Sequence, residues 1–333
     1  MVRSDTMMLL LLELQRRRMA VVSIPRDTKV ELPGYGIQKM NAAHAFGGVP
    51  LARQAVESLL GCRVDYYVKT NVAGFVELVD LLGGVRLQVE KRMRYVDRSQ
   101  GLFIRLDPGE QWLNGQKAMQ YVRFRHDLEG DLGRIRRQQK FLRALVRQAL
   151  QPENWSRLPR ILEHLPKAVE TDLNLLQMKA LLGFLREVNL EETPALQLPG
   201  TPQVQGLCYW VVEPAQAALF FQRVLESLQE EPSEARLLVC LPAQRDAWGQ
   251  EACRRLEAEG FRVAECRTDP DLPADGATTI VDLGHHYYLA QRLRRLLGAG
   301  EIRRDPLPGK PTGVDLAVMI GSDVAWASQE QGG

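Results

Sequence analysis

The chain has 333 residues, of which 45% are hydrophobic and 25% charged, as is ordinary for a soluble globular protein of about two domains. A formal net charge of +2 argues against wholesale nucleic-acid binding. The five cysteines are scattered and include no Cys-x-x-Cys pair, which excludes a zinc site of that type and gives no disulfide framework. Cys240 could bridge with Cys253 or Cys266 in an oxidising compartment, but buried free thiols are the expectation.

The chain begins with two apolar runs separated by a charged turn. Met7 to Leu12 and Ala20 to Ile24 are both predicted to form strands. Arg3-Ser-Asp-Thr6 precedes the first run, and Ser23-Ile-Pro-Arg-Asp-Thr28 continues from the second. The first run cannot be a transmembrane helix, because a span needs about 20 apolar residues. No signal-peptide pattern is visible either.

The next segments alternate between helical and strand patterns. Lys39-Met-Asn-Ala-Ala-His-Ala-Phe-Gly-Gly48 follows a turn containing glycine and proline. A short helix is expected at Gly115 to Gln120. The other predicted elements are helices at Leu51–Leu60 and Phe75–Leu82, strands at Asp65–Val68 and Val85–Val89, and a hairpin through Tyr95 and Leu102–Leu106. This mixture predicts an α/β fold with a central mixed sheet flanked by helices.

Region 121–138 is rich in arginine. Arg123 and Arg125 are two residues apart, so on a strand they would point to the same face. A loop containing glycines follows, and then a helix with Arg134 in its first turn, which Asp131 can cap. Several guanidinium groups beside a helix N-terminus suit a phosphate, because each guanidinium can bind two oxygens.

The helix that begins here has two faces. At about 100° per residue, one face is an apolar stripe formed by Ile135, Leu142, Leu145, Val146 and Ala149. The opposite side is expected to be a solvated face, formed by Arg136, Lys140, Arg143 and Arg147. Arg134 and Gln138 lie near the N-terminal end of the apolar stripe and are expected to point inward. An inward arginine is costly unless it meets an anion, which could be Asp127, Asp131 or a ligand.

Six motifs stand in order along the first part of the chain. They are Arg3–Thr6, Ser23–Thr28, Lys39–Gly48, Asp65–Asn71, Gly74–Val85 and Leu106–Gly115. In order and spacing they resemble the LytR–CpsA–Psr family, and the match runs from Arg3 to about Leu150.

The resemblance implies an extracytoplasmic, membrane-associated enzyme that moves a glycopolymer from a polyprenyl-pyrophosphate carrier onto peptidoglycan. The positions that match the family's pyrophosphate grip are Arg3, Arg26, Arg123, Arg125, Arg134 and Gln138. Arg26, Arg123, Arg125 and Arg134 are the expected catalytic residues, and Asp27 is expected to orient Arg26. Asp5 matches the acid that binds Mg²⁺. Fixed arginines and a divalent cation can stabilise the charge of a pyrophosphate transition state. Membrane lipid is an expected partner, and nucleic acid is not.

One departure bears on this expectation. In the family, a cytoplasmic tail, a transmembrane helix and a further strand that ends in a second acidic residue precede this motif. Here the motif begins at Arg3, so these segments are absent from this sequence. This absence is interpreted either as a start codon assigned too late or as a truncated copy of a family member. Two other functions therefore stay open. One is a polyprenyl-phosphate- or glycan-binding protein without turnover, and the other is a transcriptional attenuator.

After Leu150 helical patterns predominate, at Trp155–Leu165, Asn174–Val188 and Pro214–Leu228. The predicted domains are a catalytic domain at 1–228, an acidic linker at 229–234, a small α/β domain at 235–326 and a disordered tail at 327–333. The third part resembles the LytR C-terminal type of domain and is expected to be a binding or spacer module. His285 and His286 are expected to lie on its surface.

Overall fold

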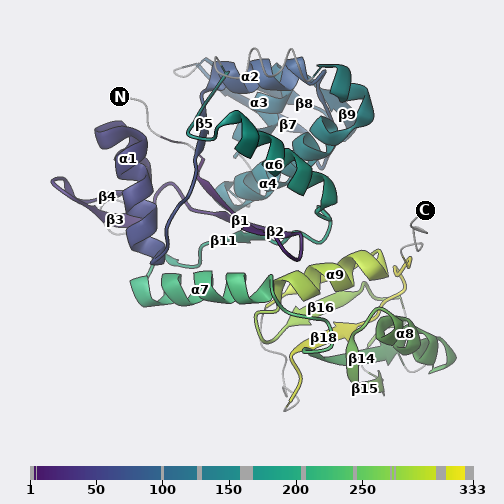
Figure 1. The fold of residues 1–333 in the computed structure, drawn as a ribbon. Coiled ribbons are helices and arrows are strands. Elements are labelled where there is room, and N and C mark those ends of the chain that lie inside the picture. Colours follow the sequence, from purple (N-terminus) through teal and green to yellow (C-terminus); the bar gives the residue numbers. More distant parts are fainter. Residues whose placement is uncertain are drawn as a thin grey trace. The chain divides into compact units, whose positions relative to one another are not determined.

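The computed structural model describes residues 4, 6–98, 101–125, 130–157, 168–203, 208–242, 246–270, 272–273, 275–304 and 313–326, with only the backbone at 130–132, 155–157 and 246–249. Its contacts divide the chain into two compact units that are both discontinuous in sequence (Figure 1). Unit 1 comprises residues 1–8, 23–190 and 201–211, and unit 2 comprises residues 9–22, 191–200 and 212–333. The domain boundaries at 228 and 235 stay a prediction, and the tail at 327–333 lies outside the described residues.

Unit 1 opens with a hairpin and a kinked helix. Strands β3 (Lys29–Leu32) and β4 (Gly36–Lys39) pair antiparallel and lead directly into α1 (Met40–Leu60). The sequence predicted only the second half of α1. Gly47 and Gly48 interrupt the helix, since Gly48 has φ 63° and ψ −153°, and this break hides the helical period.

Two helices of unit 1 begin at asparagine caps. In α2 (Val72–Leu81), the Asn71 side chain accepts a hydrogen bond from the Gly74 backbone N–H. In α3 (Gly115–Arg123), Asn114 accepts from Lys117. The prediction of a strand through Arg123 is wrong, because α3 continues to that residue. Tyr121, which is fully buried, fixes the last turn through a 2.7 Å hydrogen bond from its hydroxyl to Glu90.

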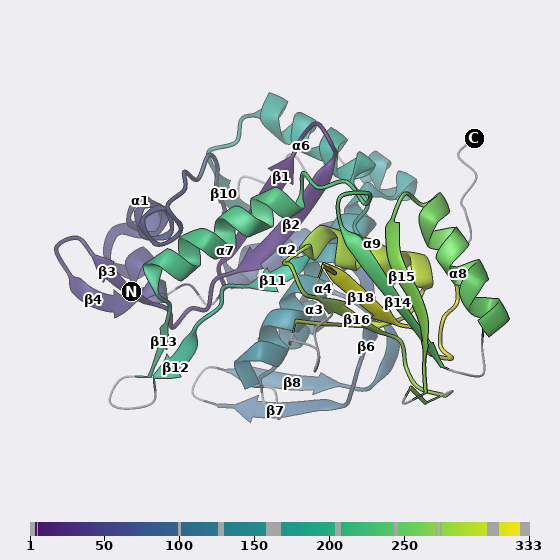
Figure 2. The ribbon, with the colours of Figure 1, turned by 90° about the horizontal axis from the view of Figure 1, so that it is seen from below.

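Two antiparallel ribbons pack beside α3 (Figure 2). Strand β6 (Val85–Val89) pairs with β9 (Gly109–Leu113), and β7 (Met93–Asp97) pairs with β8 (Leu102–Leu106). The strands alternate between buried and exposed residues, as expected of a sheet with one solvated face. The inward residues form one core with α3 and include Val85, Leu87, Val89, Met93, Ile104 and Leu106.

The rest of unit 1 contains a long helix and short ribbons. Helix α4 (Gly130–Leu150) is followed by a 3-10 turn at Pro152–Arg157. Strands β5 (Val68–Thr70) and β10 (Val169–Thr171) pair, as do β12 (Thr201–Gln203) and β13 (Tyr209–Val211). Helix α6 (Leu175–Glu187) begins at a capping box of Asn174 and Gln177. The C-terminal half of the helix predicted at 155–165 lies outside the described residues.

Unit 2 contains a five-stranded mixed sheet in the order β15-β14-β18-β16-β17. Strand β14 is parallel to both β15 and β18, while β16 is antiparallel to β18. The bounds are β14 Arg236–Pro242, β15 Arg262–Asp269, β16 Thr279–Asp282, β17 Glu301–Arg303 and β18 Leu316–Met319. Helices α8 (Asp246–Ala258) and α9 (Tyr287–Leu297) pack against this sheet.

Unit 2 also includes most of the first strands of the chain. A three-stranded sheet is formed by β1 (Met8–Glu13), β2 (Arg18–Ser23) and β11 (Ala195–Gln197). Helix α7 (Pro214–Ser227) comes after β11 in the sequence. One hydrophobic core joins residues of these elements to residues of the five-stranded sheet and its helices; it includes Leu11, Ala20, Val22, Leu196, Val224, Leu237, Val239 and Leu293. The α/β class is confirmed. Among the described residues, however, the strands of unit 1 pair only in twos, and the mixed sheet is in unit 2.

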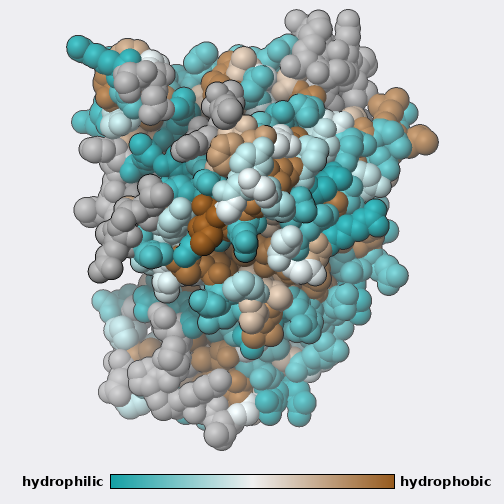
Figure 3. Space-filling model, turned by 90° about the vertical axis from the view of Figure 1, so that its left-hand side faces the viewer, coloured by the Kyte–Doolittle hydropathy of each residue, from teal (hydrophilic) through white to brown (hydrophobic). Residues whose placement is uncertain are grey.

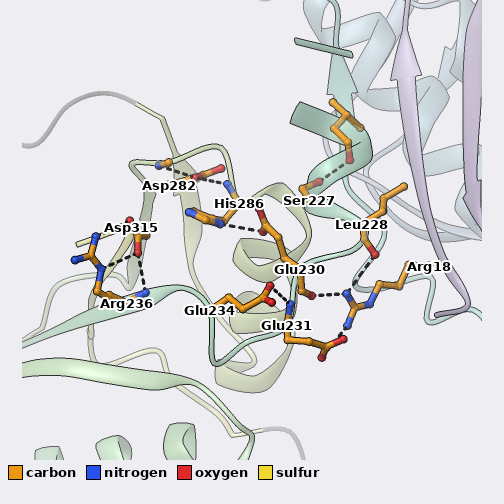
Figure 4. Close-up of polar contacts among 12 residues, drawn as sticks. Arg18, Ser227, Leu228, Glu230, Glu231, Glu234, Arg236, Asp282, His286 and Asp315 are labelled. Atoms are coloured by element: carbon orange, nitrogen blue, oxygen red, sulfur yellow. Dashed lines mark hydrogen bonds and ion pairs between the residues drawn. The ribbon is translucent and has the colours of Figure 1, made fainter. Parts of the chain in front are cut away.

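Polar contacts hold the segment predicted as a linker (Figure 4). Arg18 donates to the carbonyl oxygens of Leu228, at 3.2 Å, and Glu230, at 2.5 Å. His286 Nδ1 lies 2.9 Å from Glu230 Oε2, and only 18% of the His286 side chain is exposed. The prediction of a surface histidine pair is therefore wrong for His286, because its ring is half-buried against a carboxylate.

Three general features complete the description. No helix in the described part of the chain is both long enough and apolar enough to cross a bilayer. Cys240 and Cys253 are buried free thiols, as predicted, while Cys208 and Cys266 are exposed. On the face drawn in Figure 3, hydrophobic side chains reach the surface in small groups among hydrophilic ones.

Candidate active site

A glutamine of α4 joins two of the motif segments in unit 1. Gln138 Nε2 lies 2.8 Å from Thr6 Oγ1 and 3.2 Å from the carbonyl oxygen of Val122. Thr6 ends the first motif, and Val122 immediately precedes Arg123 at the end of α3. These hydrogen bonds hold the N-terminal motif and the end of α3 against the same helix.

The second motif reaches the same place through the backbone. The Ile24 N–H donates to the carbonyl oxygen of Met7 at 3.0 Å, so the segment leading to Arg26 lies beside the first motif. Ser23 Oγ accepts a 2.9 Å hydrogen bond from Gln139 Nε2, and both of these side chains are buried. Neighbouring residues of α4, Gln138 and Gln139, thus hold both motif segments.

Arg134 lies one helical turn before Gln138 on α4, which puts the two on one side of the helix. Only 7% of Arg134 is exposed, so the prediction that it points inward is confirmed. The helix begins at Gly130, which places Arg134 in the second turn rather than the first. Asp131 is inside the first turn instead of preceding it; its side chain, like all of Asp127, lies outside the described residues.

Arg26 stands among paired charges. Its Nε lies 3.5 Å from Asp27 Oδ2, consistent with the predicted orientation of Arg26 by Asp27. Asp27 Oδ1 also accepts a 2.8 Å hydrogen bond from Lys39 Nζ. The carbonyl oxygen of Arg26 accepts from the Asn41 N–H at 3.0 Å, so the first turn of α1 holds this backbone. About a quarter of the Arg26 side chain, 24%, stays exposed.

The structure therefore brings together segments that carry Arg26, Arg123, Arg134 and Gln138. Arg125 is exposed just beyond the end of α3 and has none of these contacts. Arg3 and Asp5 lie outside the described residues. Several guanidinium groups carried by neighbouring segments can bind an anion with several oxygens.

Sequence reasoning missed a second buried stripe on α4. Arg137 is only 4% exposed, donates to the carbonyl oxygen of Phe124 at 2.6 Å and has its guanidinium 5.2 Å from the Phe124 ring centre. Together with Arg134, Phe141 and Gln148 it follows a spacing of three, four and seven residues, which is a helical face. The position of Phe141 could have revealed this stripe.

A polar cluster at the end of β6 fixes α3 and α4 to that strand. Glu90 Oε1 accepts from the Tyr121 hydroxyl at 2.7 Å and from Lys140 Nζ at 2.6 Å. Burial by itself raises the pKa of Glu90, but the hydrogen bonds from Lys140 and Tyr121 outweigh it, and the pKa is lowered. Burial, together with Glu90, raises the pKa of Tyr121. Glu90 therefore stays ionised and anchors both helices.

The predicted metal ligand, Asp5, lies outside the described residues. Within them, no three His, Cys, Asp or Glu side chains come together as metal ligands. Asp27, the carboxylate beside Arg26, is already paired with Lys39 and Arg26, which suits an orienting role better than metal coordination.

Comparisons with known proteins agree with the motif order. The LytR_cpsA_psr family model matches residues 1–224. The regulatory protein MsrR of Staphylococcus aureus (strain COL) is 35% identical over 173 residues, which are 51% of this chain and 51% of MsrR. This chain thus spans about half the length of that relative. The polyisoprenyl-teichoic acid–peptidoglycan teichoic acid transferase TagU of Halalkalibacterium halodurans is 34% identical over 230 residues, 68% of this chain and 73% of TagU.

Solved structures show the same fold. Bacillus subtilis TagV superposes with a TM-score of 0.59 at 27% identity, covering 69% of this chain and 91% of TagV. TagT bound to LIIa-WTA gives a TM-score of 0.57 at 26% identity, covering 68% of this chain and 86% of TagT. The ordered motifs, the mixed α/β fold and a family match over residues 1–224 lead to one conclusion: the chain belongs to the LytR_cpsA_psr family.

Proposed function

We propose that this protein is a phosphotransferase that moves a glycopolymer from a polyprenyl-pyrophosphate carrier onto peptidoglycan, outside the cytoplasmic membrane. The observation that carries the proposal is the pair of hydrogen bonds from Gln138 to Thr6 and Val122, which joins motif segments around the arginines of α4. Two relatives support it by name: TagU is a teichoic acid transferase, and TagT has been solved bound to LIIa-WTA.

The reaction exchanges one phosphorus–oxygen bond for another. A hydroxyl oxygen of the acceptor glycan attacks the phosphorus nearest the sugar, and the bond from that phosphorus to the bridging oxygen breaks. Polyprenyl phosphate leaves with the bonding electron pair, and the hydroxyl proton passes to a base that none of the named residues provides. The product is a phosphodiester between glycopolymer and acceptor.

The arginines would act on charge rather than form covalent bonds. Arg26, Arg123, Arg125 and Arg134 would neutralise the pyrophosphate oxygens, and Gln138 would hold the segments that position them. Negative charge spreads over several oxygens in such a transition state, so fixed guanidiniums lower the barrier. Arg3 would add a further guanidinium from the first motif.

A magnesium ion is part of the proposal. Mg²⁺ prefers carboxylate and phosphate oxygens and retains water, a donor set that Asp5 and a pyrophosphate together supply. When bound, the ion would neutralise phosphate charge. This chain's own part would be to fix Thr6, the residue that follows Asp5 in the sequence, through the hydrogen bond from Gln138.

The part of unit 2 at residues 235–326 is proposed to be an accessory domain. Its α/β sheet with α8 and α9 is proposed to correspond to the LytR C-terminal type of domain and to serve as a binding or spacer module. A lipid or glycan binder without turnover is the second candidate function. A regulatory role is the third candidate, because the relative MsrR is named a regulatory protein.

Replacement of Arg125 tests the transferase directly. Arg125→Ala should reduce transfer to an acceptor glycan by at least a hundredfold, the usual cost of one stabilising charge. Its thermal unfolding should stay unchanged, because Arg125 is exposed. Arg63→Ala is the matched control, since the Arg63 side chain is 87% exposed elsewhere in unit 1. Transfer near the wild-type rate in Arg125→Ala would refute the assignment, and wild-type protein that binds the carrier lipid without turnover would favour the binding protein.

A further inference from the structure

The β7–β8 hairpin of unit 1 has an outer face that is both basic and apolar. We define the ribbon tip as the exposed side chains of the β7–β8 hairpin: Arg94, Val96, Arg98, Phe103 and Arg105. Residues between them on the strands, such as Met93 and Ile104, are buried in the core. The hairpin is therefore amphipathic, with its inner face satisfied by the fold and its outer face open.

On the ribbon tip, the register of the two strands places an apolar residue opposite an apolar one and an arginine opposite an arginine. Val96 lies directly opposite Phe103, and Arg94 lies directly opposite Arg105. Like charges opposite each other on a sheet are unfavourable for the fold. One of them is partly compensated, because Arg94 Nη2 lies 2.8 Å from Asp107 Oδ1. Stability of the hairpin thus does not account for this arrangement of arginines.

The apolar pair at the tip is unusually open. Phe103 is 61% exposed and Val96 is 58% exposed, and the two lie directly opposite each other on adjacent strands. Arg94 and Arg105 flank this pair on one side and Arg98 on the other. An apolar centre with cations around it is the pattern of a surface that inserts into the boundary between lipid headgroups and acyl chains.

We propose that the ribbon tip docks on a membrane surface bearing anionic headgroups. The arginines would meet the headgroup phosphates, while Phe103 and Val96 would enter the acyl boundary. This rests on the proposed function in one respect: a polyprenyl carrier lies in the bilayer, so the enzyme must work at its surface.

The tip is also connected to the candidate active site. The Arg105 N–H donates a 2.9 Å hydrogen bond to Gln120 Oε1 of α3. Gln120 stands about one turn before Arg123 on that helix. A tip resting on the headgroups would thus hold the helix that presents Arg123, within one unit of the protein (Figure 2).

An anionic polymer in solution could also meet the arginines, but it would not need Phe103. The apolar pair therefore favours a membrane. The two partners differ in a measurable way, because insertion depends on both charge and apolar area, whereas binding of a soluble polyanion depends on charge alone.

Vesicle flotation of the full chain tests the proposal. Wild type should float with phosphatidylcholine–phosphatidylglycerol vesicles and much less with phosphatidylcholine alone. Arg94→Gln/Arg105→Gln should weaken partitioning about 30-fold, from about 1 kcal/mol per arginine at an anionic surface. Phe103→Ser should weaken it about tenfold through lost apolar burial. Thermal unfolding of each variant establishes that the hairpin still folds.

Two matched variants control for charge and apolar area. Arg63→Gln/Arg254→Gln removes the same charge from sites whose side chains are 87% and 69% exposed. Val68→Ser removes an apolar side chain that is 64% exposed on another ribbon. Both should bind vesicles like wild type. Equal losses in the controls, no dependence on phosphatidylglycerol, or full binding by Phe103→Ser with tight binding of soluble polyphosphate would overturn membrane docking. Arg125→Ala should lose transfer but keep flotation, which separates this proposal from the proposed function.

Discussion

Two arginines of this chain, one in each unit, are equally buried. Arg18 of unit 2 and Arg134 of unit 1 are each 7% exposed. Arg18 is surrounded by its own unit: it donates to the carbonyl oxygens of Leu228 and Glu230 and lies 4.4 Å from the centre of the Tyr288 ring. Arg134 lies one turn from Gln138, on the helix that holds the motif segments.

The signs of the neighbouring buried charges also differ. In unit 2 the buried charged side chains include Arg18 and the carboxylates Glu192 and Asp282. Among the described residues of unit 1, the buried charged side chains are Arg134 and Arg137, both positive. Equal burial therefore does not mean an equal role. A mixed cluster stabilises its own fold, whereas Arg134 is proposed to bind the pyrophosphate.

Replacement of Arg134 should give the largest effect. Arg134→Gln should lower the rate of glycopolymer transfer by about 10²–10³-fold, because it removes a fixed charge beside the pyrophosphate. Arg136→Gln is the matched control on the same helix, since Arg136 is exposed, and it should transfer normally. Rates with a defined lipid-linked donor measure the effect. If both variants transferred equally well, the contrast between the two arginines would disappear.

Replacement of Arg18 should affect stability instead. Arg18→Gln should lower the free energy of unfolding by about 3 kcal/mol, since it breaks a buried network and leaves carbonyl groups without their donor. Arg16→Gln is the control, because the Arg16–Glu231 pair is 40% and 48% exposed and should contribute under about 1 kcal/mol. Urea unfolding of the two variants measures the difference. A loss as small as that of the control would show that the Arg18 network is not stabilising.

A pH dependence should give the smallest effect. Burial lowers the pKa of His286, but the Glu230 carboxylate outweighs this and the pKa is raised above its ordinary 6.5. Asp282 and Asp315 act in the same direction as Glu230. Since the folded pKa is raised, the stabilisation is complete below pH 6.5 and is lost as the pH rises through the raised value. The change should be on the order of 1 kcal/mol.

Urea midpoints measured across this pH range test the sign. Wild type should lose stability with rising pH relative to Glu230→Gln, in which the ion pair is absent. A difference that grows with pH would contradict the proposed pairing. Measurements at two salt concentrations would separate the pair from more distant surface charges.

Regular elements with clear periodicity were predictable from the sequence. Helices α6 and α7 and strand β8 have nearly the bounds that their apolar patterns indicate. The first half of α1 was not predictable, because the Gly47–Gly48 kink interrupts its pattern. The last turn of α3 was missed because alternating Arg123 and Arg125 imitate a strand, whereas burial of Tyr121 decides for the helix.

The candidate site was predictable in its residue types but not in its contacts. The inward direction of Arg134 follows from helical spacing, and the structure confirms it. That Gln138 bonds to Thr6 could not be known, since 132 residues separate them and only tertiary packing brings them together. The proposed roles of Arg26, Arg123, Arg125 and Asp5 stay predictions.

The shared core of unit 2 has a consequence for synthesis. Leu11, Ala20 and Val22 of the first strands belong to the same core as Leu237 and Leu293, and the Arg18 clamp on Glu230 closes a separation of 212 residues. At about 5–20 residues per second on the ribosome, synthesis of the chain between the first strands and these partners would take roughly 10–40 s. During that interval their apolar faces depend on temporary protection, so unit 2 completes its folding only near the end of translation.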